Sequence, residues 1–165
     1  MLASEIELPA PRAEHARGYA SLVRDMKLAL LSEIGARSIY DHLGRFVRDD
    51  ELKALLAKLN QEGIDSVTEL QALMRSMGAK PRRTSFRRRA LARLLALSSR
   101  VIGPRIVLRI CHNAEDTVSR WYGDYQNFLL SLGDRERAEV CGRLAITKRL
   151  HAQALAAWIS NLKRR

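Results

Sequence analysis

The segment LLSEIGARSIY, residues 30–40, indicates the fold because it places an acidic side chain within an apolar helical stripe. Residues three or four apart share one face of a helix, and this spacing continues from about residue 18 to residue 47. The members of the stripe are Leu22, Met26, Leu30, Glu33, Ala36, Tyr40, Leu43 and Val47. Since an ionised carboxylate is costly to bury without a partner, Glu33 predicts a polar site inside a helical domain.

Three further helices are predicted after this one. The second begins at an aspartate cap, Asp49 or Asp50, and ends before Gly78. The third runs from Pro104, a residue suited to the first turn of a helix, to Gly133, and the fourth follows to the end of the chain. The links within the first and the last pair are short, and the middle connection is longer. This pattern is typical of a four-helix bundle with one crossover.

The composition agrees with one helical domain. Leu and Ala, both strong helix formers, dominate the apolar residues, and aromatic residues make up only 5% of the 165-residue chain. A chain of this length can bury one well-formed core. We therefore expect an irregular lead-in at residues 1–18, which include Pro9 and Pro11, and a bundle domain at residues 19–165.

Each of the other predicted helices also carries a polar residue on its apolar face. Glu62 interrupts the second stripe, Glu115 the third, and Lys148 and His151 the fourth. Buried carboxylates need partners, so three glutamates on three separate stripes favour one shared interior site.

Ferritin-like dinuclear carboxylate proteins supply a template for such a site. They contribute one Glu from each of two helices and a Glu-x-x-His pair from each of the other two. The corresponding residues here are Glu33, the pair Glu62 and Asp65, Glu115, and the pair Lys148 and His151. Asp65 replaces a histidine and can still ligate through oxygen, whereas Lys148 as an ammonium cannot ligate.

The motifs resemble one family in particular. Glu33-Ile-Gly-Ala-Arg-Ser-Ile-Tyr40 resembles the first-helix signature of the demethoxyubiquinone hydroxylases, di-iron monooxygenases of ubiquinone biosynthesis. Gln61-Glu62-x-x-Asp65 resembles their second-helix Glu-x-x-His motif, and residues 114–122, AEDTVSRWY, resemble their Glu-Glu-x-x-x-x-His-Tyr segment. His151 fits the last histidine. The resemblance runs from about residue 22 to residue 158, with departures at Asp65, Lys148 and Trp121.

The resemblance implies a ferritin-like four-helix bundle with a two-iron site that activates oxygen to hydroxylate a quinone ring. The candidate metal ligands are Glu33, Glu62, Asp65, Glu115 and His151. A second interpretation stays open, in which the Lys148 ammonium replaces the metal, compensates the carboxylate charge and leaves a non-catalytic binding module. Tyr40 and Tyr122 lie on the faces of Glu33 and Glu115, where they either hydrogen-bond the cluster or pack in the core.

The charge of the chain favours a polyanionic partner. The formal net charge is +11, and residues 80–89 are especially basic. Residues 90–101 follow as an amphipathic stretch, and the resemblance implies a crossover of this kind held at a membrane surface. Its expected membrane-contacting residues are Arg93, Leu94, Leu97, Arg100 and Val101. The alternatives are a solvated surface and a basic ferritin-like protein that coats nucleic acid, and a partner protein or a second copy of the chain also remains open.

Two further features bear on localisation. Cys111 and Cys141 have no C-x-x-C partner and fall within helical apolar patterns, so a disulfide framework is not expected. The first residues carry acidic charge where a secretory signal needs basic charge, and no apolar run is long enough to span a bilayer. We therefore expect a cytoplasmic protein that can lie at the inner face of the membrane.

Overall fold

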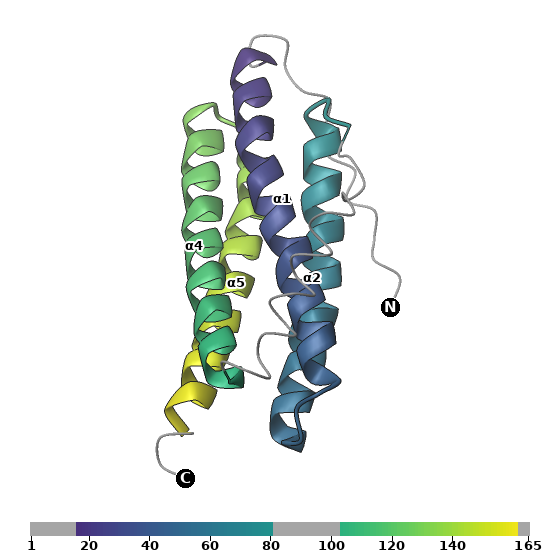
Figure 1. Ribbon diagram of the computed structural model, residues 1–165. Helices are drawn as coiled ribbons and strands as arrows, with labels where there is room; N and C mark the ends of the chain where they lie inside the picture. Colours follow the sequence, from purple (N-terminus) through teal and green to yellow (C-terminus); the bar gives the residue numbers. More distant parts are fainter. Residues whose placement is uncertain (1–15, 81–102, 162–165) are drawn as a thin grey trace.

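The computed structural model describes residues 16–80 and 103–161, and within these ranges all regular structure is helical. The helices are α1 (Ala16–Gly44), α2 (Asp50–Ser76), α4 (Pro104–Ser131) and α5 (Arg135–Asn161). They run side by side along one long axis (Figure 1). The prediction of an all-α chain with four long helices is confirmed for this part of the sequence.

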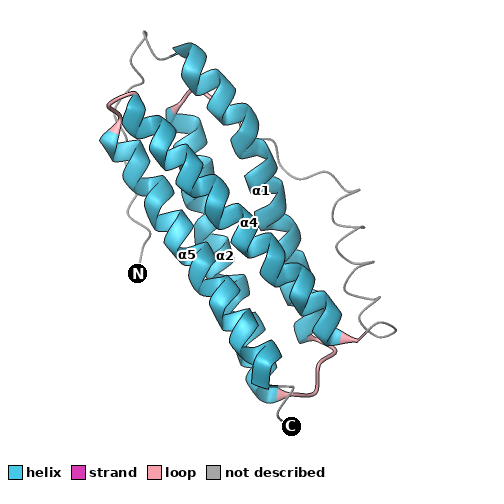
Figure 2. Cartoon of the chain, turned by 90° about the vertical axis from the view of Figure 1, so that its left-hand side faces the viewer, coloured by secondary structure: helices cyan, strands magenta, loops and turns pink. Residues whose placement is uncertain are grey.

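The helices pair as two hairpins. α1 packs along α2, and α4 packs along α5; the hairpins then meet through α1 against α4 and α2 against α5. α1 and α5 therefore lie diagonally across the bundle, as do α2 and α4. The view in Figure 2, turned by 90°, shows α4 and α5 side by side along their whole length. This arrangement gives every helix one face toward a shared interior.

Local sequence explains where the helices begin and end. Asp49 has an extended backbone, and its side chain accepts a hydrogen bond from the Leu52 amide at 2.9 Å, so Asp49 rather than Asp50 is the cap of α2. Gly78 follows α2 and Gly133 follows α4, with φ angles of 81° and 73°. Residues with a Cβ atom are strained at such positive φ angles, so glycine suits both helix ends. The first helix ends earlier than expected, because the chain turns after Gly44 to reach the Asp49 cap.

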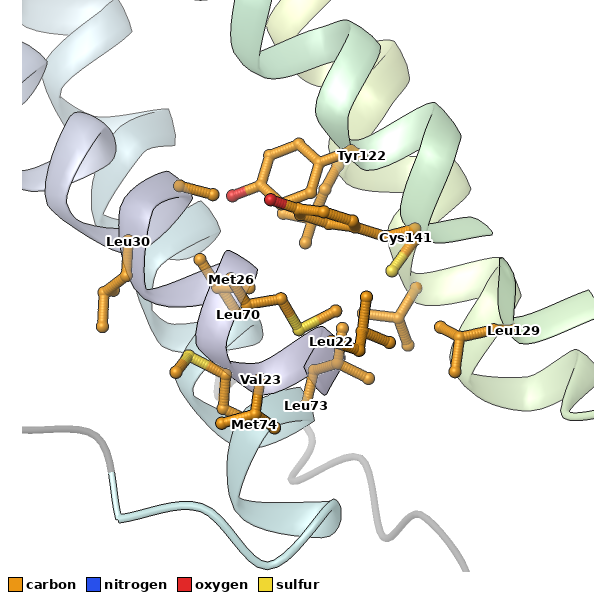
Figure 3. Close-up of a cluster of buried hydrophobic side chains, with 14 of the residues drawn as sticks. Leu22, Val23, Met26, Leu30, Leu70, Leu73, Met74, Tyr122, Leu129 and Cys141 are labelled. Carbon is orange, nitrogen blue, oxygen red and sulfur yellow. The ribbon is translucent and has the colours of Figure 1, made fainter. Parts of the chain in front are cut away.

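The apolar core consists of two clusters. The larger contains the first half of α1, from Tyr19 to Leu30, together with the facing parts of the other three helices. Figure 3 shows how its labelled side chains, among them Met26, Leu70 and Leu129, point into the common interior. The smaller cluster lies toward the other end and includes Tyr40 and Leu56. The predicted polar residues fall between the two clusters.

The buried face of α2 differs from the prediction. Glu62 is expected on it but is only partly buried, while Leu56, Gly63, Ser66, Leu70 and Met74 are buried. The apolar stripe of α2 is broad, and its centre is rotated by about one residue from the predicted line. Glu62 and Glu69 consequently lie at the edge of the helix interface.

Some predictions fall on residues that are not described. The lead-in before Ala16 and the crossover at residues 81–102, with its membrane-contacting residues Arg93, Leu94, Leu97, Arg100 and Val101, lie outside the described residues. Within residues 16–80 and 103–161, no helix is both long enough and apolar enough to cross a membrane.

Candidate functional site

A layer of buried polar side chains separates the two apolar clusters. Glu33 of α1, Glu115 of α4, and Lys148 and His151 of α5 are each at most 3% exposed. Glu62 of α2 closes the layer at its edge, where its side chain is 39% exposed. The structure thus brings together five of the residues that the sequence singled out, one or two from every helix.

Lys148 points into the middle of this layer. Its Nζ lies 2.6 Å from Glu33 Oε2 and 3.3 Å from Glu115 Oε2. One ammonium therefore bridges two buried carboxylates, which reduces the cost of desolvating all three charges. Burial alone would lower the pKa of Lys148, but the charges of Glu33 and Glu115 outweigh it and raise this pKa above 10.5. The lysine is charged at neutral pH.

His151 connects the buried carboxylates to the edge of the layer. Its Nε2 lies 2.9 Å from Glu62 Oε2, and its Nδ1 lies 3.4 Å from Lys148 Nζ. Nδ1 also lies 3.6 Å from Glu115 Oε2, so the imidazole lies between two carboxylates and the ammonium, and its Nε2 proton donates to Glu62. The imidazole thereby links α5 to α2.

Two tyrosines complete the hydrogen bonding of the carboxylates. Tyr40 donates to Glu115 Oε1 at 2.6 Å, and Tyr122 donates to Glu33 Oε1 at 3.0 Å. Each buried glutamate therefore has one oxygen near Lys148 and the other on a tyrosine hydroxyl. Both phenols are buried beside these carboxylates, and burial followed by the carboxylate charges raises each tyrosine pKa well above 10.

The two buried glutamates differ in their ease of protonation. For Glu33, burial raises the pKa, and the Glu115 charge adds to this effect, so the pKa is raised despite Lys148. For Glu115, burial also acts upward, but His151, Lys148 and Tyr40 outweigh it, and the pKa is lowered. A layer with one ammonium for two carboxylates is therefore expected to take its first proton at Glu33.

Asp65 is the predicted ligand that the structure does not bring to the site. Its side chain is exposed on α2, three residues after Glu62. Because Glu62 already lies at the edge of the buried face, a step of three residues leads outward, while a step of four leads to the buried Ser66. The prediction that Asp65 joins the cluster is corrected on this geometry.

The residues as arranged do not fit two irons. The carboxylate oxygens that would face a metal are directed at the Lys148 ammonium, which has no lone pair to donate. A cavity of about 10 Å³ lies beside Glu33, Glu115 and Lys148, which is at the lower limit for a single water molecule. Among the described residues, no set of three or more His, Cys, Asp or Glu side chains is arranged to hold a metal ion.

A second buried charge was not predicted from the sequence. Arg137 of α5 is 2% exposed and lies 2.9 Å from Asp134 through Nη1. It also donates to the hydroxyl and the carbonyl of Ser76, and its guanidinium lies 5.5 Å from the ring centroid of Tyr19. Tyr19 in turn donates to Asp134. This network, which we call the Arg137 clamp, joins α1, α2 and α5 at one end of the bundle.

Comparison of the chain with profiles of known protein families, with characterised proteins and with solved structures found no match in any of the three. The resemblance to demethoxyubiquinone hydroxylases therefore rests on the sequence motifs alone.

Proposed function

We propose that the chain is a non-catalytic, ferritin-like binding module in which Lys148 takes the place of a metal, and that the module binds the anionic surface of a membrane. The position of Lys148 Nζ between Glu33 and Glu115 supports the proposal that this lysine takes the place of a metal. In a carboxylate metal site the metal supplies the positive charge that lets acidic side chains be buried. Here an ammonium supplies it.

The polar layer favours a structural role over catalysis. The cavity of about 10 Å³ beside it leaves no room for a substrate next to Glu33 or Glu115. Its hydrogen bonds and ion pairs instead join all four helices between two apolar clusters. Buried ionic groups of this kind fix one packing arrangement, because any shift of a helix leaves a charge unpaired.

The start of α4 supports membrane contact. Ile106 and Ile110 lie one turn apart and are 49% and 42% exposed, and Arg105 and Arg109 occupy the same two turns. Exposed aliphatic side chains flanked by arginines suit the boundary between lipid headgroups and acyl chains. α4 also follows directly after the basic amphipathic stretch predicted at residues 90–101, and the chain as a whole carries a net charge of +11.

Vesicle flotation tests this proposal. We expect the purified full chain to float with vesicles that contain anionic lipid and to remain unbound with neutral vesicles. The double substitution Ile106→Ser and Ile110→Ser should weaken flotation, because it removes apolar area and leaves the charge unchanged. A matched control is Ile146→Ser with Leu150→Ser, since these residues of α5 are also one turn apart and 60% and 58% exposed.

Two outcomes would overturn the membrane assignment. One is equal flotation of both double variants. The other is salt-sensitive binding to DNA together with no flotation, which would favour the nucleic-acid alternative.

A further inference from the structure

A groove opens between α1 and α4, in the half of the bundle that holds the larger apolar cluster. Its volume is about 440 Å³, within the range of small-molecule sites. Asp25 and Leu28 of α1 form one wall. Trp121, Tyr125 and Phe128 of α4 form the other, with Asp124 beside them. The groove is separate from the exposed Ile106 and Ile110, which lie near the opposite end of α4.

The aromatic wall is built by helical spacing and is partly fixed in place. Trp121, Tyr125 and Phe128 are four and three residues apart, so they share one face of α4. Tyr125 packs edge-on against Tyr122, with ring centroids 6.0 Å apart. Gly18 of α1 admits the Phe128 ring, since a Cβ there would lie 3.3 Å from it. Three aromatic rings therefore line a groove that is open to solvent.

The two aspartates give the groove a negative charge that no described residue offsets through an ion pair. Across residues 16–80 and 103–161, neither Asp25 nor Asp124 forms a hydrogen bond or an ion pair with another described residue, although the chain has 29 Lys and Arg against 18 Asp and Glu. Both line the groove together with Tyr125, and after burial the charges of Asp25, Cys141 and Asp124 raise the pKa of Tyr125 to about 12. Two carboxylates thus face the same aromatic groove.

We infer that the groove between α1 and α4 binds an organic cation, an ammonium group carried on an apolar body, through its aromatic wall and the carboxylates of Asp25 and Asp124. Aromatic faces attract ammonium ions through their negative π surface, and the carboxylates add direct charge pairing. The apolar body of the ligand would fill the space against Leu28 and Phe128. This inference is independent of the proposed membrane binding.

A charge series tests the inference. The probes are 2-phenylethylammonium, 2-phenylethanol and phenylacetate, which share a phenyl ring and differ in charge. Binding is followed by NMR through the indole N–H signal of Trp121, which is assigned by comparison with Trp158→Phe, since the chain has two tryptophans. We expect the cation to shift this signal with an affinity about tenfold higher than the alcohol, and the anion to bind least.

Variants locate the charge effect. Asp25→Asn with Asp124→Asn should reduce cation affinity by about tenfold and leave the alcohol unchanged. Asp116→Asn is the matched control, because Asp116 is an exposed α4 aspartate that is paired with Arg120 outside the groove. Equal binding of the three probes, no shift of Trp121 with the cation, or full cation affinity in the double variant would each overturn the inference. Circular dichroism of each variant confirms that it folds.

Discussion

Lys148 Nζ lies 2.6 Å from Glu33 Oε2 and thereby joins α5 to α1, two helices that are diagonal in the bundle and whose backbones do not approach each other closely. Neighbouring helices can hold together through apolar faces, but diagonal helices need a long side chain that crosses the interior. The lysine side chain is long enough to cross the interior, and Glu33 and Glu115 balance the charge of its ammonium group. This ion pair therefore links the two hairpins across the interior.

Substitution of Lys148 by Met should strongly destabilise the fold. The change keeps an unbranched side chain of nearly the same length but leaves Glu33 and Glu115 facing each other without the ammonium between them. Removing one partner of a buried ion pair costs about 3–5 kcal/mol, and we expect a loss of this size in the free energy of unfolding, measured by urea denaturation at neutral pH. Lys58→Met is the control. Lys58 is 69% exposed and lies 3.8 Å from Glu62, so its substitution should cost less than about 1 kcal/mol.

Removal of all three buried charges should be less harmful than removal of one. The triple variant Lys148→Met, Glu33→Gln and Glu115→Gln leaves no unpaired charge in the layer, and amides can still accept from Tyr40 and Tyr122. We expect it to recover about half or more of the stability lost in Lys148→Met, as in other buried ion pairs replaced by neutral groups. A triple variant as unstable as the single one would contradict the ion-pair interpretation.

The sequence predicts the residues at the centre of the polar layer, but it does not predict which residues of α2 lie at the edge of that layer. Glu33, Glu115, Lys148 and His151 lie near the middle of their apolar stripes, so helical periodicity alone places them inside. Asp65 could not be placed in this way, because Glu62 lies at the edge of the α2 stripe and a small rotation decides which side Asp65 faces. A rotation of that size depends on packing with neighbouring helices.

Two other features had weaker signals or none. Arg137 follows Asp134 by three residues, a spacing that allows an ion pair in the first turn of α5, but in a chain with 29 Lys and Arg one arginine gives no hint of burial. The groove between α1 and α4 depends on the alignment of Asp25 with Tyr125 across two helices. No spacing within one helix encodes that alignment.

Stability should fall at alkaline pH. The pKa of Lys148 is raised above 10.5, and those of Tyr40 and Tyr122 are raised well above 10. Burial raises the pKa of the Cys111 thiol and that of the Cys141 thiol from 9 to about 12. Each of these groups loses its proton at a lower pH in the unfolded chain than in the folded one. Their contribution to the free energy of unfolding is therefore complete below about pH 9. It falls as the pH rises, by about 1.4 kcal/mol per pH unit for each proton.

The urea midpoint between about pH 8 and pH 12 measures this loss. The Tyr40→Phe and Tyr122→Phe double variant should show a shallower decline, because two of the titrating groups are gone. A midpoint that stays constant over this range in the unmodified protein would show that the buried groups do not keep their protons.

The Arg137 clamp should contribute to stability on the acidic side. Asp134→Asn removes the anion beside a buried guanidinium and should lower the free energy of unfolding by about 3 kcal/mol, read as a drop in Tm.

Burial raises the pKa of Asp134, but hydrogen bonds from Tyr19 and Arg137 outweigh it, so the pKa is lowered below 3.8. Its stabilisation is present above that pH and is lost as the pH falls, and the variant should lack this loss. The exposed pair Asp41 and Arg45 supplies the control Asp41→Asn, for which little change is expected.

Iron content tests most directly whether Lys148 occupies the place of a metal. Both the unmodified chain and Lys148→Glu are incubated with ferrous iron without oxygen, desalted and analysed for metal, with Lys148→Met as a control for the loss of the lysine alone. Lys148→Glu restores the Glu-x-x-His pair of α5 next to Glu33 and Glu115. We predict iron far below one equivalent in the unmodified chain and close to stoichiometric iron in Lys148→Glu; stoichiometric iron in the unmodified chain would contradict the account.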